Sequence, residues 1–92
     1  MTPQDVRRLR TAFGFTQTEL AGLVGVAPST VSRWESPCLP LRVEPLQSKL
    51  LLLLAKHELR ASDLGQTLRS ALATHGGLAA IHVLLRAEYG DP

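Results

Sequence analysis

The sequence has 92 residues, a formal net charge of +2, a hydrophobic content of 45% and an aromatic content of only 4%. A chain of this size holds one compact core but not two independent domains, and its many leucines and alanines favour helices over sheets. The single cysteine, Cys38, excludes an internal disulfide and a thiolate metal cage, and the longest apolar run, 50–55, is far shorter than the roughly 20 residues of a membrane span.

The distribution of charge and the first ten residues indicate where the protein acts. Residues 1–60 hold eight Lys and Arg against five Asp and Glu, whereas residues 61–92 hold two against three. The basic first part suits a polyanion, and the second part suits a protein partner. The opening MTPQDVRRLR lacks the apolar stretch of a signal peptide, so we expect a cytoplasmic protein that stays off the membrane.

The first two predicted helices are short and have clear ends. Apolar residues recur at helical spacing over Pro3–Phe13, and Gly14 is expected to end that helix. Thr16 and Glu19 form a capping-box pattern, which opens a second helix that ends at Gly25. These signals predict two helices joined by a tight turn.

A third helix is predicted to begin at Pro28, because proline suits the first position of a helix. It is expected to run to about Ser36, where Pro37 and Pro40 stop it and predict an extended connection to Pro45. Only about three residues separate it from the second helix, which is the spacing of a helix-turn-helix.

The fourth predicted helix starts at Pro45 and carries the most apolar stretch of the chain. Its expected stripe is Leu46, Leu50 and Leu53 or Leu54. The consecutive leucines of 50–54 nevertheless cover every side of this helix. A helix that is apolar all round must be buried on more than one face, so something beyond the first three helices has to cover it.

Two further helices are predicted downstream, as a hairpin. Ser62 is expected to cap the first of them, which ends at 75–77. The expected apolar stripes are Leu64, Leu68 and Leu72 on the first helix, and Leu78, Ile81 and Leu85 on the second. Because two helices of about a dozen residues are marginal alone, the hairpin should pack on the fourth helix, on a second copy of the chain, or on both.

Together these elements predict an all-α protein of five to six helices. Residues 1–57 are expected to form the first domain, and residues 58–92 a helical extension that dimerises. The candidate dimerisation residues are Leu50, Leu53, Leu54, Leu78, Ile81 and Leu85. For the leucine run, a place in the core and a place in an interface are equally compatible with the pattern.

The stretch GFTQTELAGLVGVAPSTVSRWE closely resembles the helix-turn-helix of the phage lambda repressor and Cro family, also called the xenobiotic-response-element (XRE) family of transcriptional regulators. The resemblance covers about residues 5–56 and depends on residues that stand in the family's order and spacing. These are Thr16-Gln17, Glu19-Leu20-Ala21, Gly25-Val26 and Thr30-Val31-Ser32-Arg33-Trp34-Glu35. The sequence departs from the family at Ala27, where serine or threonine is common, and at Ser36-Pro37, which replaces a glycine-containing turn.

Helical spacing sorts the third helix into two faces. If Val31 and Trp34 point at the core, the outward set can enter the major groove of DNA. That outward set is Pro28, Ser29, Ser32, Arg33 and Ser36. Arg33 is the strongest candidate for base readout, because a guanidinium can donate two hydrogen bonds to guanine.

The family resemblance adds roles for residues outside this face. It implies that Gln17 binds a backbone phosphate, and that Arg10 and Glu35 form an ion pair tying the first helix to the end of the third. The full set of candidate DNA-binding residues is Gln17, Thr18, Pro28, Ser29, Thr30, Ser32, Arg33 and Arg42. Whether Arg33 meets a base or a phosphate stays open at this point.

No pattern in the sequence points to catalysis. The three histidines, His57, His75 and His82, lie on separate segments without the spacing of a metal site. No set of Ser, His and Asp suggests a nucleophile with its base. We therefore expect no enzyme activity, no metal and no cofactor.

Two functions of different classes compete. The leading hypothesis is a homodimer that binds an inverted-repeat operator in double-stranded DNA and represses transcription, with the helix that begins at Pro28 in the major groove. The alternative is an antitoxin or adaptor protein whose C-terminal helices, within 58–92, bind a protein partner, with DNA binding secondary.

Overall fold

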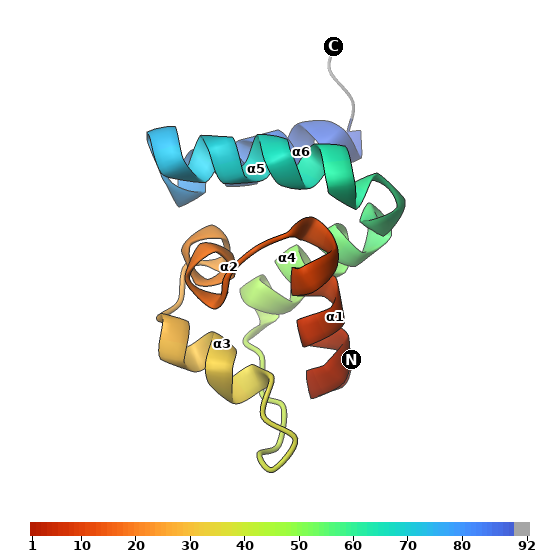
Figure 1. Ribbon diagram of the computed structural model, residues 1–92, viewed down its shortest axis with the longest axis vertical. Helices are drawn as coiled ribbons and strands as arrows, with labels where there is room; N and C mark the ends of the chain where they lie inside the picture. Colours follow the sequence, from red (N-terminus) through yellow and green to blue (C-terminus); the bar gives the residue numbers. More distant parts are fainter. Residues whose placement is uncertain (90–92) are drawn as a thin grey trace.

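The computed structural model describes residues 1–89, and within them the chain is all-helical. The elements are α1 (Pro3–Phe13), α2 (Gln17–Val24), α3 (Pro28–Trp34), α4 (Pro45–Lys56), the 3-10 turn η1 (Glu58–Arg60), α5 (Ala61–His75) and α6 (Gly77–Tyr89). In Figure 1, α5 and α6 lie side by side across one end of the molecule, and α3 lies toward the other end. The predicted all-α class, with a helix-turn-helix core followed by a helical hairpin, is confirmed.

Local signals in the sequence start and end the first two helices. The backbone N–H of Glu19 donates to Thr16 Oγ1 at 3.1 Å, and the N–H of Thr16 donates to the Glu19 carboxylate at 2.8 Å. This is the predicted capping box. Gly14 and Gly25 adopt φ of 74° and 81°, a left-handed conformation that glycine adopts without steric cost. The predicted boundaries of both helices are therefore confirmed.

The third helix is shorter than the sequence predicts. It begins at Pro28 as expected but ends at Trp34, and the N–H of Ser36 closes a tight turn onto the carbonyl of Arg33 at 3.1 Å. The following Pro37 disfavours helical backbone at Ser36. Ser36 therefore does not belong to the outward face of the helix, and that part of the prediction is wrong.

The buried stripe of α4 differs in register from the predicted one. Leu46 is 63% exposed, and the neighbouring Gln47 faces α2 instead, where its side-chain amide donates to the carbonyl of Val24 at 3.0 Å. The buried leucines are Leu50, Leu51 and Leu54. The inference that a later part of the chain covers this helix is confirmed, since α6 packs against α4.

Two of the leucines proposed for dimerisation lie in the protomer's own core. Leu50 is 5% exposed and Leu54 is 0% exposed, so neither presents a surface to a second copy. Their assignment to a subunit interface is corrected for this reason. Leu53 is half-buried against the core, whereas Leu78 and Leu85 lie on the surface.

The start of α5 and the buried stripe of α6 differ from the prediction, whereas Leu64 and Leu68 of α5 are buried as predicted. Ser62 does not cap α5, because the turn η1 runs directly into the helix and Ser62 falls in its exposed first turn. On α6 the expected stripe is also wrong, since Ala80 and Leu84 are fully buried while Leu78 points to solvent.

Two glycines let the hairpin approach the first helices backbone to backbone. A Cβ built on Gly65 would lie 2.3 Å from the carbonyl oxygen of Phe13, and one on Gly77 would lie 2.2 Å from the carbonyl oxygen of Gly22. No larger residue fits such distances without moving a helix. Gly65 therefore allows α5 to pack closely against α1, and Gly77 allows α6 to pack closely against α2.

An ionic contact secures the far end of the hairpin. The Glu88 carboxylate of α6 meets Lys56 at the end of α4 and a ring nitrogen of His57, the latter at 2.9 Å. These two hydrogen bonds hold the pKa of the Glu88 carboxyl below its ordinary value, and the bond from Lys56 has the larger effect. Within residues 1–89, no helix is both long and apolar enough to cross a membrane.

We predict that Gly65→Ala destabilises the protein by about 1 to 3 kcal/mol, because the added methyl group collides with the backbone of Phe13. The matched control is Gly22→Ala, whose Cβ would meet only Leu72 at 3.6 Å, and whose better helix propensity should stabilise α2 by up to about 1 kcal/mol. Urea unfolding followed by circular dichroism measures both. Equal effects of the two substitutions would contradict the close approach of α5 to α1.

Candidate nucleic-acid interface

The turn between α2 and α3 sets the angle at which α3 leaves the core. The N–H groups of Gly25 and Val26 both donate to the carbonyl of Ala21, at 2.8 and 3.0 Å. Ala21 is buried between the two helices, and its small side chain lets them cross closely. From α3, Val31 and Trp34 enter the core at 0% and 4% exposure, as predicted. The inner face of α3 is therefore fixed.

The opposite face of α3 is open to solvent. Pro28, Ser29, Ser32 and Arg33 are exposed, and Thr30 is half-buried. Within the described residues, no side-chain hydrogen bond or ion pair engages Arg33. Because α3 lies away from the hairpin (Figure 1), neither α5 nor α6 covers this face. The arrangement leaves one unpaired guanidinium and two hydroxyls facing outward from a short rigid helix.

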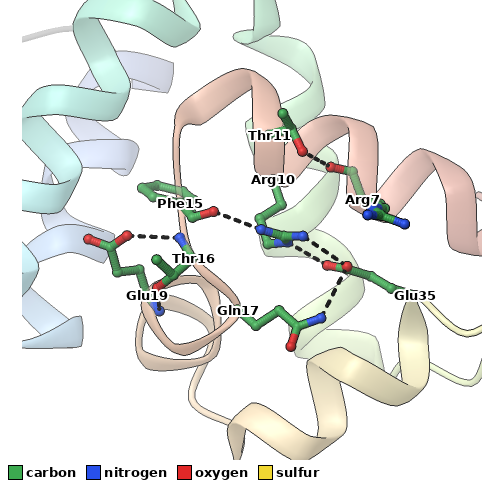
Figure 2. A network of polar contacts seen from close by, with 8 residues as sticks. All are labelled: Arg7, Arg10, Thr11, Phe15, Thr16, Gln17, Glu19 and Glu35. Atoms are coloured by element: carbon green, nitrogen blue, oxygen red, sulfur yellow. Dashed lines mark hydrogen bonds and ion pairs between the residues drawn. The ribbon is translucent and has the colours of Figure 1, made fainter.

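A polar network fastens α3 to the helices before it (Figure 2). Arg10 of α1 makes a two-pronged contact with the Glu35 carboxylate, with Nε at 2.6 Å and a terminal nitrogen at 3.1 Å. Its other terminal nitrogen donates to the carbonyl of Phe15 at 3.0 Å. The Arg10 and Glu35 side chains are 17% and 6% exposed. The pairing implied by the family resemblance is thus present in the structure.

Gln17 has a structural partner that the sequence did not indicate. Its side-chain amide donates to the same Glu35 carboxylate at 3.3 Å, so it joins α2 to the end of α3. An amide nitrogen carries two donors, and one of them remains for a phosphate. The phosphate contact stays a prediction, as does that of Thr18, which is exposed on the next position of α2.

Arg42 lies on the connection that follows α3, outside any helix. The indole N–H of Trp34 donates to the carbonyl of Arg42 at 3.1 Å, which draws the connection back against α3. Between them is a hollow, called here the arginine hollow, lined by Thr30, Arg33, Trp34, Leu39, Pro40 and Arg42. The structure therefore brings Arg42 and Arg33 to the same hollow beside α3.

The histidines and the cysteine are spread over the molecule. His57 contacts Glu88, while His75 and His82 line a surface depression on the hairpin, and Cys38 is exposed in the connection after α3. Among residues 1–89, no group of three or more His, Cys, Asp and Glu side chains is arranged to hold a metal ion.

We predict that Glu35→Ala destabilises the protein by about 3 to 5 kcal/mol, because it leaves the guanidinium of Arg10 buried without its partner. The double variant Arg10→Met with Glu35→Leu should recover much of this loss, since it removes both charges and keeps apolar volume. Thermal unfolding of Arg10→Met, of Glu35→Leu and of the double variant measures the coupling, and Glu35→Ala reports the loss of the carboxylate alone. Additive losses in the double variant would mean that the ion pair does not hold α3.

Comparison with known proteins agrees with this geometry. Residues 6–36, which run from α1 to just beyond α3, match the model of a family described as helix-turn-helix. No curated protein and no solved structure was found to match the chain. The matched residues carry both the Arg10–Glu35 pair and the exposed face of α3. Residues 6–36 therefore form a helix-turn-helix, which supports the resemblance to the XRE, lambda-repressor-like family and, in general terms, a DNA-binding regulator.

Proposed function

We propose that the protein is a sequence-specific transcriptional repressor that binds double-stranded DNA as a homodimer and inserts α3 into the major groove of an inverted-repeat operator. The observation that carries the proposal is the exposed face of α3, where Arg33 lacks an intramolecular partner while Val31 and Trp34 anchor the opposite face. A free guanidinium on a rigid helix is suited to donating two hydrogen bonds to guanine.

The other candidate residues divide between bases and backbone. Ser29 and Ser32 lie on the exposed face with Arg33, and their hydroxyls donate or accept, so they discriminate less among bases. Pro28 offers apolar contact to a thymine methyl. The phosphate contacts are assigned to Gln17 and Thr18 of α2, to Thr30 of α3 and to Arg42 of the connection after it. Of these, Thr18 also borders the hairpin, where it lines a hollow with Arg69 and Gly77. Phosphate contacts fix the register of the helix, and base contacts select the sequence.

A homodimer is supported by the outward face of α6. Leu78 is 71% exposed, Leu85 is 36% exposed and Tyr89 is 80% exposed, and they recur along one side of the helix, with Ile81 half-buried beside them. Large apolar side chains grouped on a surface are typical of an interaction site. A two-fold dimer that presents two copies of α3 about 34 Å apart would meet successive turns of one DNA face.

Selection of bound duplexes from a random DNA pool tests the proposal directly. We expect an enriched inverted repeat with half-sites about ten base pairs apart, and affinity that falls steeply as salt rises. A pool that stays random, with binding that depends only on salt, would contradict sequence-specific recognition. An enriched single half-site would contradict the homodimer.

For the recovered sequence, we predict that Arg33→Ala weakens binding by about 1 to 3 kcal/mol and relaxes preference at one base pair of each half-site. The control is Arg60→Ala, which removes an exposed arginine from η1, outside both α3 and the apolar stripe of α6. Fluorescence anisotropy with matched and mismatched duplexes measures both. If the Arg33→Ala protein ranks the matched and mismatched duplexes in the wild-type order, Arg33 does not contact a base.

For the dimer, we predict that Leu78→Asp yields a folded monomer, because it places a charge in the apolar stripe of α6 without touching the core. Leu59→Asp is the control, since Leu59 is fully exposed on η1. Analytical ultracentrifugation and circular dichroism report mass and folding. A Leu78→Asp protein that remains dimeric would remove α6 from the interface. A wild-type protein that is monomeric on its own would favour a different protein partner for this stripe.

A further inference from the structure

The arginine hollow combines two positive charges with apolar walls. Arg33 and Arg42 both line it and are both exposed, and the apolar lining comes from Trp34, Leu39 and Pro40. None of the residues that line the hollow carries a carboxylate. Leu39 is 46% exposed, so the wall presents apolar surface to solvent. A cavity with an apolar lining and a few convergent polar groups is the usual form of a small-molecule site.

We propose that the arginine hollow binds a small amphiphilic anion, with an apolar body against Trp34, Leu39 and Pro40 and an acidic group between Arg33 and Arg42. Guanidiniums bind carboxylate, sulfonate and phosphonate groups through charge-assisted hydrogen bonds. The apolar body gains free energy in proportion to the nonpolar area that it covers. The bound anion acts as an effector that keeps α3 off DNA. This second part rests on the proposed function.

The walls of the hollow distinguish this ligand from the DNA backbone. A phosphodiester group can satisfy the two arginines, but it is strongly hydrated and gains little from an indole, a leucine and a proline. A ligand that has both a charge and an apolar body uses every side of the hollow. The apolar walls are the reason to infer an effector in addition to a phosphate contact.

The hollow is held in place by contacts with the rest of the fold. Trp34 is 4% exposed, and its indole N–H holds the carbonyl of Arg42 at 3.1 Å, so one wall is anchored in the core. The N–H of Leu39 meets the carbonyl of Ser36 at 3.4 Å at the start of the connection. The indole and the backbone around the hollow are therefore preformed, and a ligand has to order only the exposed side chains of Arg33, Leu39 and Arg42.

Occupation of the hollow and binding of DNA are mutually exclusive in this arrangement, because both require Arg33. A ligand that neutralises Arg33 removes the main base contact and places its own bulk beside the exposed face of α3. By linkage, DNA lowers the affinity for the anion by the same factor as the anion lowers the affinity for DNA.

The protein contains a single tryptophan, which lines the hollow and therefore reports on it. The probe is anilinonaphthalene sulfonate, an aromatic anion that accepts excitation energy from tryptophan. We expect saturable quenching of Trp34 with rising probe emission. Phenylnaphthylamine, which lacks the sulfonate, and inorganic sulfate, which lacks the apolar body, should each bind about tenfold more weakly or worse.

Substitutions in the hollow show where on the protein the probe binds. Arg42→Ala removes one guanidinium, and Leu39→Ser removes an exposed part of the apolar wall. Each should weaken probe binding about tenfold without loss of helical circular dichroism. The control is Arg86→Ala, which alters the depression on the hairpin lined by His75, Leu78, Ala79, His82, Val83 and Arg86. If Arg86→Ala weakens the probe as much as Arg42→Ala does, or if quenching does not saturate, the arginine hollow is not the site.

Displacement by DNA tests the effector role separately. The duplex recovered by selection should release the probe from the wild-type protein, whereas a scrambled duplex at the same concentration should not. A probe that stays bound while the selected duplex binds would overturn the effector role. If selection recovers no sequence, the proposed function fails, but the titration of Trp34 and its variants still decides whether the hollow binds an amphiphilic anion.

Discussion

The orientation of α3 depends on the Glu35 carboxylate just after its last turn. This carboxylate receives Arg10 from α1 and Gln17 from α2, while Arg10 also holds the carbonyl of Phe15 between those two helices. A helix of seven residues is not stable by itself, so its position has to come from tertiary contacts. A buried ion pair adds little net stability, because removing two charges from water is costly. The ion pair instead fixes the orientation of α3, because the planar guanidinium of Arg10 donates both hydrogen bonds only when the carboxylate of Glu35 lies in one position.

The fold separates the two surfaces that carry the proposed activities. The described chain extends 43 Å along its longest axis, with α3 toward one end and the hairpin of α5 and α6 at the other (Figure 1). The arginine hollow is lined by residues of α3 and of the connection after it. One continuous core joins α3 and the hairpin, and it includes Trp34 of α3 as well as Leu68 of α5. A partner on α6 and a DNA duplex on α3 therefore do not compete for the same surface. Coupling between them would have to pass through this core.

Features that depend on residues close in sequence could be predicted from the sequence. The capping box of Thr16 and Glu19, the left-handed Gly14 and Gly25, and the start of α3 at Pro28 each follow from local sterics and hydrogen bonding. The outward face of α3 also follows from helical spacing. The contact of Gln17 with Glu35 could not be predicted, because helical spacing within one element does not say which side chains meet across two.

The register of the hairpin shows why periodicity alone was insufficient. On α6, leucine and isoleucine at 78, 81 and 85 form one stripe, and the smaller Ala80 with Leu84 forms another, so hydrophobicity favours the wrong side. The close approach of Gly77 to the carbonyl of Gly22 decides between them, since it brings the start of α6 against α2 and turns Ala80, three residues later, into the core. Gly65 allows an equally close approach of α5 to α1, where the predicted stripe of Leu64 and Leu68 is the buried one. Bulkier side chains would hold the helices farther apart, so the two glycines leave the larger apolar stripe of α6 on the surface, where a partner can reach it.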